Sequence, residues 1–154
     1  MPPALARAPC DWSAILRLIQ TEFAYMDGVI DPPSSMHRLG VEDIARQASE
    51  GEVWVIGAPP VACAFFTVKD DALYVGKLAV DAAHRGQGHA RALLDMADRR
   101  AAAQGLRWLE LQTRIELGAN HAAFRRLGFH ETGRTAHPGY ARPTSVTMRR
   151  AVAL

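Results

Sequence analysis

The run from Val61 to Val68 limits the possible folds more than any other segment, because its apolar residues occupy both alternating sets of positions. Successive side chains of a β-strand point to opposite faces of the sheet. This run therefore predicts a strand that is covered on both faces. Turn residues separate it from two further predicted strands, at Val53–Ile56 and Leu73–Val80. Helices must then pack above and below the sheet.

Helical patterns lie before and after these strands. A helix is predicted from Asp11, which can cap it, to Phe23, and a second one from Val41 to Ser49. The later segments are predicted as a long helix at Gly88–Gln104, a strand at Arg107–Thr113, a helix at Ala119–Leu127, and strands at Phe129–Thr135 and Thr144–Ala151. This order predicts a mixed α/β fold with one βαβ unit in its second half.

Length and composition indicate an ordinary globular protein. A chain of 154 residues can bury a sizeable core without disulfides or a structural metal, so we expect a single domain over residues 1–154. The longest uncharged stretch, Val53–Val68, is broken by Gly57 and two prolines and is too short for a membrane helix. With no secretory signal evident at the N-terminus, we expect a cytoplasmic protein with no membrane partner.

The charged residues and the histidines give no support to a nucleic-acid partner or to a metal site. The net charge is only +2, and the basic residues are scattered, which suits one anionic ligand better than a nucleic acid. The six histidines show neither HxxxH nor HExxH spacing. We therefore expect no nucleic-acid partner and no metal site.

The segment from Leu78 to Ala90 carries the clearest functional signal. It runs from a predicted strand through a loop that contains Gly86 and Gly88 into the longest predicted helix. The N–H groups of a first helical turn have no intrahelical partner, and the helix dipole adds positive potential there. Glycines let a ligand approach such a backbone closely, and Arg85 adds a positive charge. The arrangement predicts a site for a diphosphate.

The loop Arg85-Gly86-Gln87-Gly88-His89-Ala90 matches the signature Gln/Arg-x-x-Gly-x-Gly/Ala of the GCN5-related N-acetyltransferase (GNAT) family. The chain resembles this family over most of its length, through to Arg126-Leu127-Gly128-Phe129. The resemblance implies a central, mostly antiparallel sheet with helices on both faces and one splayed pair of strands. It also implies acetyl-CoA as the co-substrate.

The resemblance further assigns roles in cofactor binding. It implies that residues 85–90, Arg85 to Ala90, hold the pyrophosphate, while Leu78, Ala79 and Val80 pair with the pantetheine arm through their backbones. Asn120 stands where the family often has a pantetheine contact. Phe124 stands where many members have a tyrosine that protonates the leaving thiolate. Phenylalanine has no proton to give, although its ring can still pack against the arm.

Two residues are candidates for acid–base catalysis, which amine acetylation requires. Glu110 lies on the strand Arg107–Thr113 and could act as the base, directly or through water; the alternative is an ion pair with a nearby arginine. Tyr140, in a loop between the last two strands, could replace the missing acid. The alternative for Tyr140 is a packing role.

The acceptor site is expected between the first two helices, where the family builds it. Tyr25, Met26 and Asp27 are the candidate residues. Asp27 could hold a cationic amine, or it could be a solvated carboxylate at a helix end. Together these features predict an acetyl-CoA-dependent N-acetyltransferase that acts on a primary amine of a small molecule or peptide, by direct transfer in a ternary complex and as a possible homodimer.

Two other functions stay open. The first is a non-catalytic acyl-CoA-binding sensor or regulatory module, which Phe124 motivates. The second is a phosphate-binding fold unrelated to CoA, which would bind nucleotides as well as it binds CoA. Loops that vary freely build acceptor pockets, so the acceptor itself is not identified.

Overall fold

A computed structural model of the chain describes residues 1–153, and in this part of the chain seven strands form one sheet in the order β1-β2-β3-β4-β5-β7-β6. The strands are β1 (Ala4–Leu5), β2 (Glu52–Ile56), β3 (Ala62–Lys69), β4 (Ala72–Val80), β5 (Trp108–Arg114), β6 (His130–Thr135) and β7 (Ser145–Ala151). The helices are α1 (Trp12–Phe23), α2 (Val41–Glu50), α3 (His89–Ala103) and α4 (Gly118–Arg126), with short 3-10 helices η1 (Ala24–Met26), η2 (Ser35–Arg38) and η3 (Ala82–His84). The predicted mixed α/β fold is confirmed.

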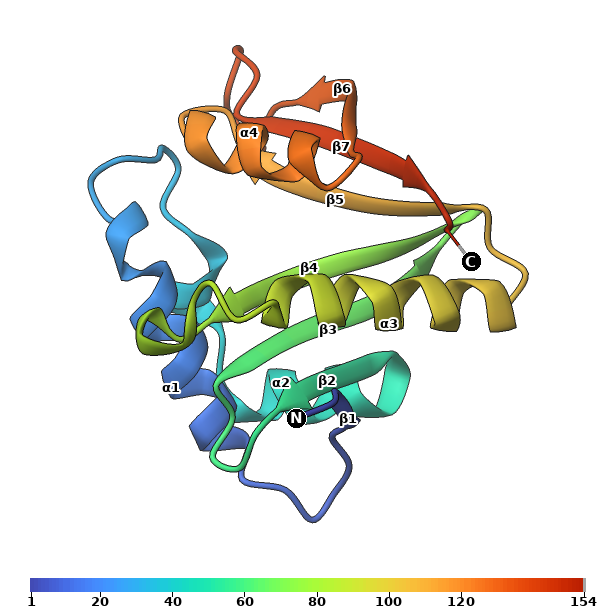
Figure 1. Cartoon of the computed structure of the whole chain (residues 1–154). Helices are drawn as coiled ribbons and strands as arrows, with labels where there is room; N and C mark the ends of the chain where they lie inside the picture. The colour runs from blue at the N-terminus through green and yellow to red at the C-terminus, as the bar shows by residue number, and fades with distance from the viewer. Residues whose placement is uncertain (154) are drawn as a thin grey trace.

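The sheet is antiparallel except where β4 meets β5. These two parallel strands pair only from Ala72 to Tyr74 on β4, opposite Trp108 to Glu110 on β5. Beyond these pairs they diverge, and Figure 1 shows them together at one end and apart at the other. The splayed pair that the family resemblance implies is therefore present, and α3 connects its two strands.

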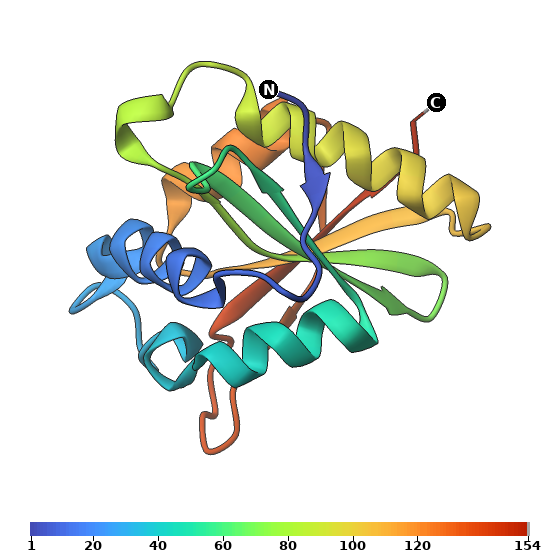
Figure 2. The ribbon, with the colours of Figure 1, turned by 90° about the horizontal axis from the view of Figure 1, so that it is seen from below.

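Helices cover both faces of the sheet, with α1 and α2 on one side and α3 and α4 on the other (Figure 2). On β3, Cys63 and Phe65 pack into the cluster with α1 and α2, while Ala64 and Phe66 pack into the cluster with α3. This alternation confirms the doubly covered strand. The prediction is wrong for Val68, which is 53% exposed. This residue lacks the expected cover, because the strand there approaches the turn into β4.

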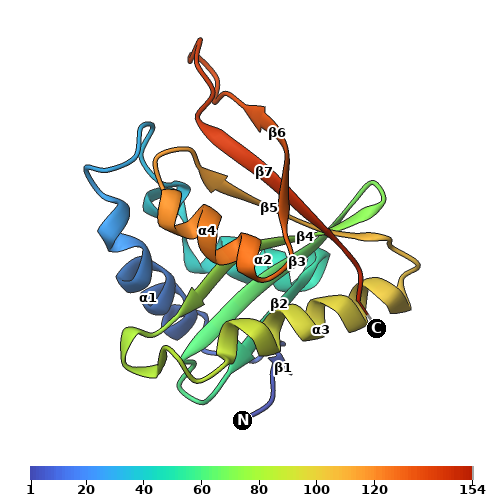
Figure 3. The same cartoon turned by 45° about the horizontal axis from the view of Figure 1, so that its top comes forward.

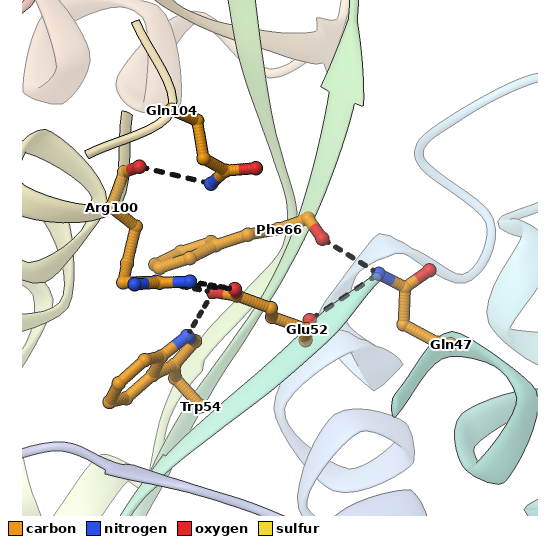
Figure 4. A network of polar contacts seen from close by, with 6 residues as sticks. All are labelled: Gln47, Glu52, Trp54, Phe66, Arg100 and Gln104. Carbon is orange, nitrogen blue, oxygen red and sulfur yellow. Dashed lines mark hydrogen bonds and ion pairs between the residues drawn. The ribbon is translucent and has the colours of Figure 1, made fainter. Parts of the chain in front are cut away.

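A polar network ties β2 to helices on both faces of the sheet (Figure 4). The carboxylate of Glu52 accepts hydrogen bonds from Arg100 of α3, the shortest at 2.6 Å, and one from Nε1 of Trp54 at 2.9 Å. From the other face, Nε2 of Gln47 donates to the backbone oxygens of Glu52 and Phe66 at 3.3 and 3.0 Å. Glu52 therefore fixes the position of α3, the helix whose first turn begins the predicted diphosphate site.

Across residues 1–153, no helix is both long enough and apolar enough to cross a membrane.

Replacing Arg100 by Gln should destabilise the protein in a pH-dependent way. Burial raises the pKa of Glu52, but the hydrogen bonds from Arg100 and Trp54 outweigh burial and lower the pKa overall. A carboxyl whose pKa is lowered by folding stabilises the folded state above its unfolded pKa, and this contribution is lost as the pH falls through the folded value. We expect Arg100→Gln to lower the free energy of unfolding by about 1–2 kcal/mol near pH 7 and by less in acid.

Urea unfolding of the wild-type and variant proteins at several pH values would measure this difference. Arg99→Gln is the matched control, because Arg99 neighbours Arg100 on α3 but is exposed to solvent. A pH-independent difference would show that Arg100 stabilises α3 by packing rather than through Glu52.

Candidate functional site

A cavity of about 1080 Å³ lies where β4 and β5 diverge. Its wall is formed by both strands, the end of α1, the segment from η1 to η2, the start of α3 and one side of α4. Figure 3 shows these elements gathered around the open end of the strand pair. The short β4–β5 ladder thus creates the space, and segments distant in the sequence line it.

The glycine loop opens onto one end of this cavity. Gly86 and Gly88 have left-handed backbones, with φ of +76° and +82°, and Gly88 is the N-cap of α3. A Cβ atom added at either glycine would meet no heavy atom within 4 Å, so the space above the loop is open. Five of the six predicted loop residues line the cavity, all except Gln87: Arg85, Gly86, Gly88, His89 and Ala90.

Free donors and the helix dipole make this end attractive to an anion. The first intrahelical hydrogen bond of α3 runs from the N–H of Ala92 to the oxygen of Gly88, at 2.9 Å. The N–H groups of the preceding residues, His89 and Ala90, therefore have no intrahelical acceptor. Such a helix start is an ordinary site for phosphate groups.

The predicted cation beside the loop is paired with a buried carboxylate that the sequence analysis missed. Arg85 donates to Oε2 of Glu22 at 2.7 Å, and Oε1 of Glu22 accepts from the N–H of Ala82 at 3.0 Å. Glu22 is 7% exposed and lies on α1. A signal was available, because Glu22 follows Ile15 and Ile19 on the apolar stripe of that helix. This link between α1 and the loop holds the loop in place.

The end of β4 forms the floor of the cavity. Leu78, Ala79 and Val80, the residues expected to contact the pantetheine arm, all line it. Beyond Tyr74 the edge of β4 that faces β5 has no strand partner within residues 1–153. Backbone donors and acceptors of this edge are therefore free to pair with an extended ligand.

A bulge alters β4 just before these residues. Between the pairs Cys63–Ala79 and Phe65–Gly76, β4 has two residues, Lys77 and Leu78, and β3 has one. Lys77 has a left-handed φ of +50°. A non-glycine residue in this region costs on the order of 1–3 kcal/mol and is most frequent at functional sites. The side chain of Lys77 lines the cavity. No motif in the sequence pointed to this residue.

Helix α4 and η1 close the remaining side. Asn120 and Phe124 of α4 both line the cavity, as do Tyr25 and Met26 of η1. Nδ2 of Asn120 donates to the hydroxyl oxygen of Tyr25 at 3.1 Å. The structure thus brings together two predicted cofactor residues and two predicted acceptor residues.

The structure does not bring Glu110 to the cavity. Glu110 is 3% exposed, and its carboxylate accepts from Nζ of Lys69 at 2.7 Å and from Nε of Arg149 at 2.9 Å. It borders a separate hollow that Trp108 also lines. The alternative considered from the sequence, an ion pair with a nearby arginine, is the arrangement observed. A carboxylate held by two cations outside the cavity does not fit the role of general base.

Tyr140 and Asp27 also lie outside the cavity lining. The hydroxyl of Tyr140 donates to Oδ1 of Asp31 at 2.6 Å, and this hydrogen bond raises the pKa of the phenol. Asp27 pairs with Nε2 of His37 at 2.7 Å. Each side chain is therefore engaged by a neighbour, and neither has the placement that its expected role requires.

The charges around the cavity are unequal. Five cationic side chains line it: Arg38, Lys77, Arg85, Arg91 and Arg114. Among the described residues Glu22 is the one acidic lining residue, and it is paired with Arg85. No group of three or more potential metal-ligating side chains was found among these residues.

The strands that diverge after three residue pairs, together with the glycine loop that begins α3, define the fold of acyl-CoA N-acyltransferases. A family model described as the acetyltransferase (GNAT) domain matches residues 49–131, more than half of the chain. The protein therefore belongs to the GNAT family of acetyltransferases. That family uses acetyl-CoA as its co-substrate.

Solved structures support the fold. The ribosomal-protein-S18-alanine N-acetyltransferase of Escherichia coli is 20% identical, with a TM-score of 0.69 over 99% of this chain and 94% of that chain. A GNAT-family acetyltransferase of Staphylococcus aureus is 14% identical, with a TM-score of 0.74 over 98% of both chains. Ard1 of Thermoplasma volcanium is 15% identical, with a TM-score of 0.67 over 100% of both chains. No curated protein sequence matches this chain.

Replacing Gly88 by Val should abolish binding of acetyl-CoA while the protein stays folded. The side chain would enter the open space above the loop, and a β-branched residue would resist φ of +82°. Gly105→Val is the matched control: Gly105 lies just beyond the other end of α3, has φ of +72° and also faces open space.

Calorimetric titration with acetyl-CoA, CoA and ATP would compare the three proteins. We expect both variants to lose similar stability and only Gly88→Val to lose affinity for acetyl-CoA. Equal affinity in both folded variants would show that the loop does not hold the diphosphate.

Proposed function

We propose that this protein transfers an acetyl group from acetyl-CoA to a primary amine of a small molecule or peptide, directly and in a ternary complex. One observation carries the proposal: the glycine loop at the start of α3 and the unpaired edge of β4 open onto the same cavity. A diphosphate at the loop and an extended arm along β4 would point a thioester toward the side lined by η1 and η2. The remaining space there would take the amine.

The residues present fit acetyl-CoA. Free N–H groups at His89 and Ala90 suit the diphosphate, and the backbone from Leu78 to Val80 suits the amide groups of the pantetheine arm. Bound acetyl-CoA would supply the activated acetyl group. A backbone N–H near Val80 would stabilise the negative charge that develops on the carbonyl oxygen.

Direct transfer is supported by the thiol chemistry of the chain. Neither cysteine lines the cavity among the described residues. Cys63 is fully buried, and burial raises its pKa to about 12. Because the thiolate is the nucleophilic form, Cys63 is unsuited to forming an acetyl-enzyme.

Transfer also needs a proton donor, because the C–S bond breaks as the amine nitrogen bonds to the carbonyl carbon. The nitrogen loses a proton to solvent, and the sulfur gains one. Two tyrosines line the cavity, Tyr25 and Tyr74, and Tyr25 is the one that meets α4, one turn before Phe124. Since Asn120 donates to the hydroxyl oxygen, the hydrogen of Tyr25 stays free to donate. We assign to Tyr25 the acid role that Phe124 cannot perform.

Replacing Tyr25 by Phe should lower kcat for acetyl transfer by about 10²-fold or more, the usual contribution of a general acid. Affinity for acetyl-CoA should change little. Tyr140→Phe is the matched control, because its hydroxyl donates to Asp31 outside the cavity. CoA release in the presence of a panel of amines, followed against pH, would measure both variants.

A Tyr25→Phe enzyme as fast as the wild type at every pH would exclude Tyr25 as the acid. Tight acetyl-CoA binding with no amine-dependent release of CoA by the wild type would favour the non-catalytic sensor instead. The single-domain organisation, the cytoplasmic location and the homodimer stay predictions.

A further inference from the structure

The cationic side chains around the cavity form two groups. Arg85, in the loop before α3, and Arg91, in the first turn of α3, lie beside the proposed diphosphate site. Lys77, Arg38 and Arg114 come from β4, η2 and β5, on the side proposed for the amine. These three residues, which we call the acceptor-side cations, are not needed to bind the cofactor.

Lys77 is directed to this place by the backbone. The bulge in β4 and the left-handed φ of +50° set its direction, and its Nζ donates to Oγ of Ser35 in η2 at 2.6 Å. Burial lowers the pKa of Lys77, and repulsion from Arg114 and Arg38 lowers it further. Arg114 and Arg38 are therefore close enough to Lys77 to repel its charge.

The two arginines differ in what they contact. Arg114 donates from Nη1 to the oxygen of Pro32 at 2.6 Å and from Nη2 to the oxygen of Pro33 at 3.0 Å. These bonds use its donors to fix the loop before η2. Arg38 is exposed and, like Lys77, forms no ion pair with a carboxylate in residues 1–153. Arg38 and Lys77 thus have donors available for a ligand.

Nearby acidic groups do not neutralise this charge inside the cavity. Glu116, whose charge acts on Arg114, accepts the N–H of Asp31 at 3.1 Å. Asp31 itself pairs with Arg142 at 3.2 Å, and Asp27 pairs with His37. None of these carboxylates lines the cavity. His137 adds a further basic group to the lining, and its pKa is lowered by burial and by Arg114 and Arg38.

We propose that the acceptor amine also carries an anionic group, such as the carboxylate of an amino acid, which Lys77 and Arg38 bind. This inference rests on the proposed function, because it names the acceptor of that reaction. An anion between the two side chains would replace their mutual repulsion by charge-assisted hydrogen bonds. A polyamine or other polycation would be repelled.

The same charges would assist the reaction. Cations beside an ammonium group favour its neutral form and lower its pKa. The neutral amine is the nucleophile, so the acceptor would lose its proton to solvent more readily in the cavity than in water. This supplies the deprotonation for which no unpaired carboxylate is present in the described lining.

Matched pairs of acceptors would test the proposal. L-Phenylalanine, L-methionine and L-leucine would be compared with their carboxamides, and phosphoethanolamine with ethanolamine, by the kcat/KM of CoA release. We expect the anionic member of at least one kind of pair to react 10-fold faster or more. A preference for the amino acids over their carboxamides would identify the bound group as a carboxylate. A preference for phosphoethanolamine alone would identify it as a phosphate.

Variants would connect this preference to the acceptor-side cations. Arg38→Gln is expected to reduce the preference, so that the kcat/KM values of the anionic and neutral acceptors of each pair differ by about 3-fold or less. Lys77→Gln is expected to have the same effect. Arg46→Gln is the control, because Arg46 is an exposed arginine of α2 that pairs with Asp43 and should leave the preference unchanged. Arg38 is exposed, so its variant should fold even if the bulge variant does not.

A binding experiment separates this proposal from the proposed function. N-acetyl-L-phenylalanine and its amide would be titrated calorimetrically into the protein in the presence of CoA, with phosphate as a third probe. If no amine is acetylated, but an anionic probe binds and Arg38→Gln weakens it 10-fold, the anion site stands and the transferase proposal fails. Three results would overturn the anion site. Neutral and anionic acceptors could react and bind equally well, polyamines could be preferred, or neither Arg38→Gln nor Lys77→Gln could change the preference.

Discussion

The site depends on the separation of β4 from β5 after three residue pairs. A parallel ladder that continued would satisfy the backbone of both strands and leave no cavity between them. Because pairing stops at Tyr74 and Glu110, the rest of β4 has one unpaired edge, and the divergence makes room for α4 and η1 to approach it. The glycine loop follows directly where β4 ends. One interruption in a sheet thus places a free backbone edge and a helix N-terminus around the same space.

Two strained or buried features keep this space in shape. The bulge at Lys77 costs conformational energy, yet it directs a charged side chain into the cavity. Glu22 is buried, but its two oxygens are met by Arg85 and the N–H of Ala82, which offsets the cost of burial. With Arg85 engaged by Glu22, the free N–H groups of α3 would be the principal donors for the proposed diphosphate. Arg85 would then serve mainly to position the loop.

Local patterns predicted the fold well, because its strands and helices depend on residues that are close in the sequence. Most strand and helix boundaries follow from hydrophobic periodicity, although the two-residue strand β1 and the 3-10 helices were not predicted. The loop from Arg85 to Ala90 is a continuous motif. The catalytic assignments needed long-range information. Glu110 is held by Arg149, 39 residues away, and Tyr140 by Asp31, 109 residues away. Lys77 and Glu22 belong to no motif, so only the folded chain shows that they meet the cavity.

The unequal charge of the cavity also bears on the order of events in a reaction cycle. An amino acid enters as a zwitterion with no net charge, whereas its N-acetyl product has lost the ammonium and is a net anion. The proposed acceptor site, with uncompensated cations at Lys77 and Arg38, would therefore bind the product more strongly than the substrate. Arg38, being exposed, lies where solvent can screen its charge and let the product leave. In this protein the feature that selects the acceptor would then also govern how fast the site is cleared.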